Sequence, residues 1–128
     1  MAVTVLLVED DELVRCVTAE LLRDEGFKVY EAHDGDLAAL FINTGPAFDV
    51  LLTDVNMPGT MDGWDLADHA RGCLPNLPVI VVSGRANNVA RWRKLGPLCT
   101  FFQKPCRMRD LATEVLRLTG LKQVVASS

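Results

Sequence analysis

Histidine is scarce in this chain of 128 residues, and its cysteines are unpaired. The chain has two histidines, His33 and His69, and four cysteines that form no CxxC pair and show no histidine at metal-ligand spacing. This pattern excludes a zinc finger and a disulfide-stapled scaffold. We expect the cysteines to be free thiols of a reducing compartment, which predicts a cytoplasmic location.

Long hydrophobic runs are absent as well. The apolar segment 1–8 carries no basic leader and runs directly into the acidic residues 9–12. A secretory signal begins with a basic segment, and a membrane helix needs about 20 apolar residues. The sequence therefore predicts no targeting segment and no membrane partner.

Basic residues are few in the first part of the chain. Residues 1–70 contain three basic and fifteen acidic side chains, whereas residues 71–128 contain ten basic and two acidic ones, for a net charge of −4. The net charge argues against a protein that coats nucleic acid. The uneven division predicts an acidic site and a separate basic surface.

The pattern of apolar residues predicts a single α/β domain over residues 1–128. A chain of this length buries one core but not two. Short apolar runs alternate with amphipathic segments of helical period, and the runs span 3–8, 27–31, 48–53, 79–82 and 99–103. Runs that are apolar on both faces are typical of strands buried between two layers. The alternation predicts a five-stranded parallel sheet with helices on both faces.

Glycine and proline mark the expected ends of the helices. Gly26, the pair Gly45-Pro46 and Gly72 each follow an amphipathic segment. Gly120 is expected to end the last helix, which would leave residues 120–128 as a C-terminal tail.

Polar residues stand where the expected strands end. Glu9 and Asp10 follow the first run, Asp54 the third, Ser83 the fourth and Lys104 the fifth. Ligands gather at the carboxyl ends of parallel strands, and carboxylates brought together there repel one another unless a cation binds. Oxygen ligands favour Mg²⁺. Beside such an ion, Asp54 is suited to attack a phosphoryl group, with Lys104 and Ser83 supplying a charge and a hydroxyl.

Four segments in this order resemble the receiver domain of two-component response regulators: LLVEDDELVR at 6–15, LLTDVNMPGTMDG at 51–63, VIVVSG at 79–84 and FFQKP at 101–105. The resemblance covers residues 2–119, the expected core of the domain. It implies a flavodoxin-like, doubly wound sheet in the strand order 2-1-3-4-5. It also implies a signalling switch that catalyses only its own phosphorylation and dephosphorylation, and not an enzyme.

The resemblance implies a role for each matching residue. Asp54 would accept a phosphoryl group from a phosphohistidine on a histidine kinase or a histidine phosphotransfer protein. Ser83 and Lys104 would contact the phosphoryl oxygens. The ligands of Mg²⁺, or of Mn²⁺ in its place, would be Glu9, Asp10, Asp54 and the backbone carbonyl of Asn56.

Some positions near Asp54 depart from the common pattern of receiver domains, and others correspond to positions that affect hydrolysis in the family. Phe101 occupies the aromatic switch position, where tyrosine is common. Residues 59–61 contain one residue more than the usual spacing, which predicts a displaced loop. The resemblance also implies that Asn56 and Arg85 take the two positions that, in the family, influence hydrolysis of the aspartyl phosphate.

The basic surface is expected to bind a downstream protein in response to phosphorylation. The residues of this partner face would be Arg91, Trp92, Arg93, Lys94, Arg107 and Arg109. They fit a docking surface for an acidic downstream protein, although Trp92 packing inward and arginines that only solubilise would give the same pattern. We expect a monomer or weak dimer without direct nucleic-acid contact, either a stand-alone receiver or one excised from a hybrid kinase.

Three other functions fit parts of the sequence. Asp54, Asn56 and Asp65 are spaced like calcium ligands, but Pro58 and the preceding apolar strand count against a calcium loop. A phosphatase with an aspartyl nucleophile would need a second carboxylate where Asn56 stands. An interaction module independent of phosphorylation would be expected to lack Asp54, Lys104 or the acidic pair, and none of these is missing.

Overall fold

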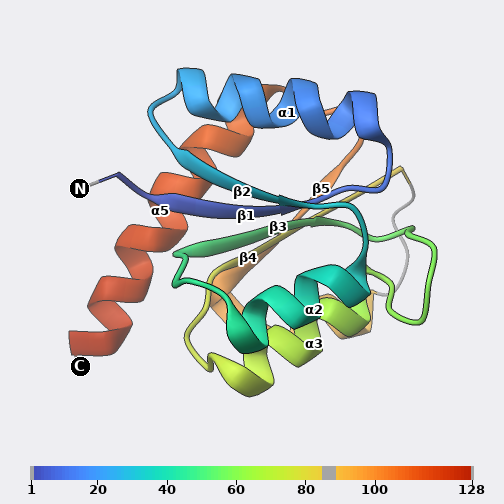
Figure 1. The fold of residues 1–128 in the computed structure, drawn as a ribbon. Helices are drawn as coiled ribbons and strands as arrows, with labels where there is room; N and C mark the ends of the chain where they lie inside the picture. The colour runs from blue at the N-terminus through green and yellow to red at the C-terminus, as the bar shows by residue number, and fades with distance from the viewer. Residues whose placement is uncertain (1, 85–88, 128) are drawn as a thin grey trace.

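The computed structural model describes residues 2–84 and 89–127 (Figure 1). Within them, five strands form one parallel sheet in the order β2-β1-β3-β4-β5. The strands are β1 (Thr4–Val8), β2 (Lys28–Ala32), β3 (Val50–Asp54), β4 (Val79–Ser83) and β5 (Cys99–Gln103). The predicted fold class and strand order are therefore confirmed, and no strand end differs from the expected one by more than two residues.

Helices cover both faces of this sheet (Figure 1). On one face lie α1 (Glu12–Asp24) and α5 (Met108–Ser127), and on the other lie α2 (Gly35–Thr44) and α3 (Gly63–Cys73). A short helix α4 (Val89–Lys94) and a 3₁₀ turn (Gly96–Leu98) lead from β4 to β5. No helix in the described ranges is long and apolar enough to span a membrane.

The sheet separates two apolar cores because successive strand residues point to opposite faces. Leu6 and Leu51 pack with Trp64 under α2 and α3, whereas Leu7 and Leu52 belong to the core under α1 and α5. The central strands are thus apolar on both faces, as the sequence predicts. The polar residues of β3 and β4 lie at the carboxyl edge of the sheet.

Aspartates fix the starts of the first three helices. Asp11, Asp34 and Asp62 each accept a hydrogen bond from the backbone N–H three residues later, which satisfies a donor that the helix itself leaves unpaired. These caps begin each helix close behind a strand end. The residues that follow the strands are therefore held in short connections.

The prediction that Gly120 ends the last helix is wrong. Helix α5 continues to Ser127. One glycine inside a helix costs only about 1 kcal/mol relative to alanine. The residues that follow, among them Leu121, Lys122 and Gln123, are good helix formers and sustain the helix beyond it.

Candidate functional site

The strand register brings an acidic cluster together at the carboxyl edge of the sheet. Val8 of β1 pairs with Thr53 of β3. The residues that follow them, Glu9 and Asp54, are therefore neighbours. Asp10 follows Glu9, and one carboxylate oxygen from each of the three residues lies within 4.8 Å of the other two. The acidic cluster expected from the sequence is present in the fold.

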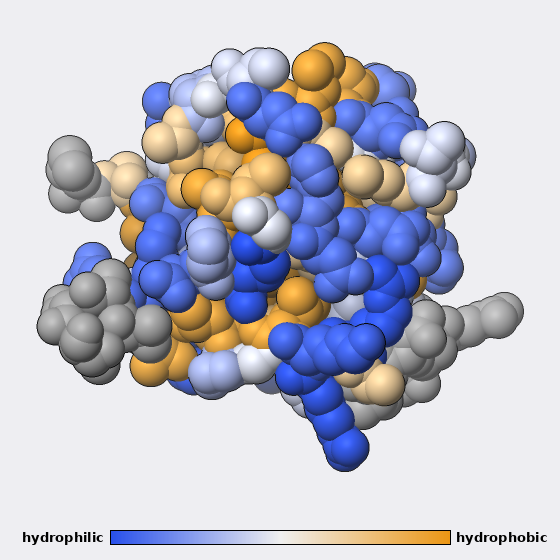
Figure 2. All heavy atoms as spheres, turned by 90° about the horizontal axis from the view of Figure 1, so that it is seen from below, coloured by the Kyte–Doolittle hydropathy of each residue, from blue (hydrophilic) through white to orange (hydrophobic). Residues whose placement is uncertain are grey.

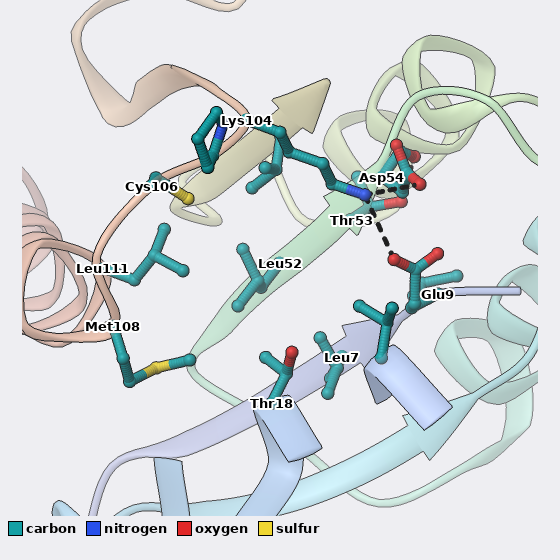
Figure 3. Close-up of a pocket in the computed structure, with 14 residues that line it drawn as sticks. Leu7, Glu9, Thr18, Leu52, Thr53, Asp54, Lys104, Cys106, Met108 and Leu111 are labelled. Carbon is teal, nitrogen blue, oxygen red and sulfur yellow. Dashed lines mark hydrogen bonds and ion pairs between the residues drawn. The ribbon is translucent and has the colours of Figure 1, made fainter. Parts of the chain in front are cut away.

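Lys104 reaches this cluster from the end of β5 (Figure 3). Its Nζ lies 3.0 Å from Asp54 Oδ2 and 3.2 Å from Glu9 Oε1. Burial lowers the pKa of the Lys104 ammonium, but the hydrogen bonds and charges of Asp54 and Glu9 outweigh burial and raise the pKa. Lys104 therefore carries a positive charge at neutral pH.

Glu9 has the least exposed side chain of the three carboxylates, with 6% of its side chain exposed. Burial first, and then the charge of Asp54, raise the pKa of Glu9 to about 7, although Lys104 acts in the opposite direction. Its Oε2 is buried and has no hydrogen-bond partner. One lysine thus leaves excess negative charge and an unused ligand oxygen, which fits a hard divalent cation.

The other residues predicted around the acceptor take different positions. Ser83 follows Val82, which pairs with Asp54, and it is completely buried. The backbone N–H of Lys104 donates to the Ser83 carbonyl at 2.7 Å, so the ends of β4 and β5 are joined here. Asn56 is exposed in the loop after β3. Arg85 lies outside the described residues.

Phe101, at the expected switch position, contacts two tryptophans. Its ring stacks on Trp64 of α3, with 6.2 Å between centroids and 6° between planes. Trp92 of α4 meets the Phe101 ring at 6.1 Å and 39°. Trp64 is not predicted from the sequence, in which its only signal is its place after Gly63 at a helix start.

The loop that contains the additional residue is tied to the start of α2. The carboxylate of Asp36 accepts hydrogen bonds from Thr60 N at 3.1 Å and from Thr60 Oγ1 at 2.5 Å. Gly59 beside it has a φ of +99°, and a Cβ there would stand 2.6 Å from the Asp36 carboxylate. The loop thus needs glycine at this position for two reasons.

The start of α3 lies directly against the backbone of Asp54. Gly63 N–H donates to the Val55 carbonyl at 2.8 Å. A Cβ on Gly63 would stand 2.1 Å from the carbonyl oxygen of Asp54. Only glycine permits this approach, so Gly63 helps to fix the position of Asp54.

Two residues of the expected partner face make contacts within the chain. Arg91 pairs with Asp65 at 3.1 Å and with Asp68 at 2.5 Å. Trp92 is half-buried, and its Nε1 donates to the Cys99 carbonyl at 3.0 Å. These two residues hold α4 against α3 and β5. The basic residues of the face that are exposed are Arg93, Lys94, Arg107 and Arg109.

A cavity of about 430 Å³ continues from the acidic cluster into the space under α1 and α5 (Figure 3). Its walls are mainly apolar and include Leu52, Met108 and Leu111. Cys106 also lines the cavity, and burial raises the pKa of its thiol. The charged groups Glu9, Asp54 and Lys104 close one end only.

A doubly wound sheet that presents three carboxylates and one lysine at its carboxyl edge has the architecture of a phosphoryl-accepting signalling domain. The family model of the response regulator receiver domain matches residues 5–116. The chain belongs to this family.

Individual proteins agree with this assignment. The chain is 36% identical over 114 residues to the sensor kinase CckA of Brucella abortus, covering 88% of this chain but only 12% of that protein. It is 30% identical over 120 residues to sporulation initiation phosphotransferase F of Bacillus subtilis, covering 92% and 94% of the two chains. The crystal structure of a response regulator receiver protein from Sinorhizobium medicae superposes with a TM-score of 0.85 at 32% identity, covering 94% and 97%.

Proposed function

We propose that Asp54 accepts a phosphoryl group from a phosphohistidine on a histidine kinase or a histidine phosphotransfer protein. The observation that carries this proposal is the Lys104 ammonium, which lies within hydrogen-bond distance of both Asp54 and Glu9. A lysine and a ring of carboxylates are what phosphoryl transfer to a carboxylate needs, because the reaction depends on positioning and charge neutralisation. The names of two relatives, a sensor kinase and a phosphotransferase, support a place in such a relay.

The residues that would hold Mg²⁺ are Glu9, Asp10 and Asp54, with the backbone carbonyl of Asn56 as a fourth protein ligand. The buried, unpartnered Glu9 Oε2 supports this assignment, as does the oxygen-only donor set. When bound, Mg²⁺ supplies positive charge that offsets the carboxylates and the incoming phosphoryl oxygens.

The transfer is a substitution at phosphorus. A carboxylate oxygen of Asp54 forms a bond to phosphorus as the bond from phosphorus to the histidine nitrogen breaks, and that nitrogen keeps the electron pair. The Lys104 ammonium, already 3.0 Å from Asp54 Oδ2, neutralises charge on the transferred group. Ser83, at the end of β4, provides a hydroxyl for another phosphoryl oxygen.

A phosphoryl group on Asp54 carries a charge of about −1.5 to −2, which replaces the single negative charge of the carboxylate and so makes the edge of the sheet more negative. Lys104 is joined to Ser83 through the backbone, and Phe101 on β5 contacts Trp92 on α4. These contacts support a path from the acceptor to the exposed basic residues of α4 and α5. We infer that an acidic downstream protein docks there.

The proposal is tested by intact mass after incubation with Mg²⁺ and a small phosphodonor. The wild-type chain should gain one phosphoryl group, a chelator should prevent the gain, and Mn²⁺ should restore it. Asp54→Asn should gain none, whereas Asp24→Asn, which changes an exposed aspartate on α1, should behave as wild type. Phosphorylation of Asp54→Asn, or catalytic release of phosphate from simple esters, would overturn the proposal.

A further inference from the structure

Three metal-binding atoms converge on the outer side of helices α2 and α3, away from the acidic cluster. The expectation that no histidine stands at metal-ligand spacing from a cysteine is wrong for one pair. His69 and Cys73 are four residues apart on α3, which places them on one face of the helix. The distance from Cys73 Sγ to His69 Nε2 is 3.9 Å. Asn43 of α2 brings its Oδ1 to 3.0 Å from His69 Nε2 and to 3.7 Å from Cys73 Sγ.

These separations match the donor triangle of a tetrahedral transition-metal site. Zinc bonds are about 2.3 Å to sulfur and about 2.0–2.2 Å to nitrogen or oxygen, so neighbouring donors lie about 3.4–3.6 Å apart. The three observed distances bracket this range, and shifts of a few tenths of an ångström would place all three atoms around one ion. Cys73 and Asn43 are exposed and His69 is half-buried, so the fourth position is open to water.

We propose that His69, Cys73 and Asn43 bind one Zn²⁺ ion or a similar divalent transition metal. Thiolate and imidazole favour zinc, whereas Mg²⁺ prefers oxygen ligands alone. The site lies at the carboxyl end of α3, where the helix dipole favours a cation. Figure 2 views the molecule from the side of α2 and α3, where hydrophilic and hydrophobic residues are interspersed. The exposure of Cys73 and Asn43 leaves the proposed site open to aqueous ions.

Binding changes the protonation of two side chains. The Cys73 thiol releases its proton to water and binds as thiolate. His69 binds through Nε2 as a neutral ring with its proton on Nδ1, which replaces the hydrogen bond between Nε2 and Asn43 Oδ1. The Asn43 oxygen then faces the ion. One metal ion would thus link the carboxyl ends of α2 and α3, which lie on the side of the fold opposite the carboxyl ends of the strands (Figure 1).

The experiment uses Co²⁺ as a spectroscopic probe, added to the reduced 128-residue chain in the presence of excess Mg²⁺. We expect one Co²⁺ per chain with a thiolate charge-transfer band and the intense visible bands of tetrahedral cobalt, both removed by Zn²⁺. Cys73→Ser should abolish the thiolate band. Cys73→Ser and His69→Gln should each weaken Zn²⁺ binding at least about tenfold, the smallest loss typical of disturbing even the outer shell of a metal site.

Matched controls locate the site. Cys16→Ser removes another exposed thiol, on α1, and Asp54→Asn alters the acidic cluster, so both variants should retain the band. Far-UV circular dichroism checks the fold of each variant, and His69→Gln tests the site with all four thiols present. A thiolate band that survives Cys73→Ser or is lost in Cys16→Ser would overturn the proposal. So would weak octahedral cobalt bands alone, or displacement of the metal by Mg²⁺.

Discussion

The Nζ of Lys104 lies 3.0 Å from Oδ2 of Asp54, a contact between residues that are 50 positions apart in the chain. Because Lys104 also contacts Glu9, its charge is held between two carboxylates before any phosphoryl group arrives. We expect Lys104→Met to slow phosphorylation of Asp54 by a small phosphodonor about 100-fold, the lower end of the loss typical when one preorganised donor is removed. A time course of intact mass at saturating Mg²⁺ measures this rate.

Lys94→Met is the matched control for that experiment. Lys94 is exposed on α4, so its loss should leave the rate with a small phosphodonor within about twofold of wild type, since exposed charges contribute little. Equal rates for Lys104→Met and wild type would show that Lys104 has no part in the transfer.

The two tryptophans offer an optical test of the proposed switch. Trp64 stacks on Phe101, and Trp92→Phe would leave Trp64 as the sole tryptophan of the chain. If Phe101 changes its rotamer on phosphorylation, the emission of Trp64 must change with it, because the stacked ring is its neighbour. We expect a shift in intensity or wavelength that follows the gain of mass and is absent when Asp54→Asn is added. Complete phosphorylation without any change in emission would contradict a switch through Phe101.

The residues of the acidic site could be predicted from the sequence because they stand at the carboxyl ends of the strands. Apolar runs define the strands, and the residues that follow them must meet at one edge of a parallel sheet. Glu9, Asp54 and Lys104 come together for this reason. The strand order itself came from the family resemblance, since alternation of strands and helices alone permits several orders.

Other parts of the site could not be predicted because they depend on contacts between distant loops and helices. The stacking of Trp64 on Phe101 joins residues that no local sequence pattern connects. The same is true of the hydrogen bond from Thr60 to Asp36. The length of α5 was missed for a different reason. A glycine such as Gly120 is a common helix stop, but the residues after it decide whether the helix ends.

Gly63 and Gly72 provide a matched pair of substitutions on α3. A Cβ at Gly63 would overlap the Asp54 carbonyl, whereas one at Gly72 would meet no atom within 4 Å. We expect Gly63→Ala to lower the free energy of unfolding by at least about 2 kcal/mol, as overpacking does, and to slow phosphorylation by displacing Asp54. Gly72→Ala should raise the free energy of unfolding by about 0.5–1 kcal/mol. Urea titrations measure both, and similar values for the two variants would refute the role assigned to Gly63.

Glu114 links β5 to α5 and gives the stability a dependence on pH. Its carboxylate accepts hydrogen bonds from Arg117 and from the Thr100 hydroxyl. The hydrogen bond from Arg117, and after it the one from Thr100, lower the pKa of Glu114 below its ordinary value of 4.5, although burial opposes them. A carboxylate whose pKa is lower in the folded state stabilises the fold above its unfolded pKa, and this contribution is lost as the pH falls through the folded value.

We therefore expect Glu114→Gln to lower the free energy of unfolding at neutral pH by less than about 1 kcal/mol, because Arg117 is largely exposed and solvent screens the pair. The difference from wild type should stay constant above pH 4.5 and shrink as the pH falls below it. Urea titrations across this range measure the difference, with Glu20→Gln, an exposed glutamate on α1, as the control that should stay close to wild type throughout. A difference for Glu114→Gln that grows as the pH falls would have the wrong sign and would rule out a stabilising role for the ionised carboxylate.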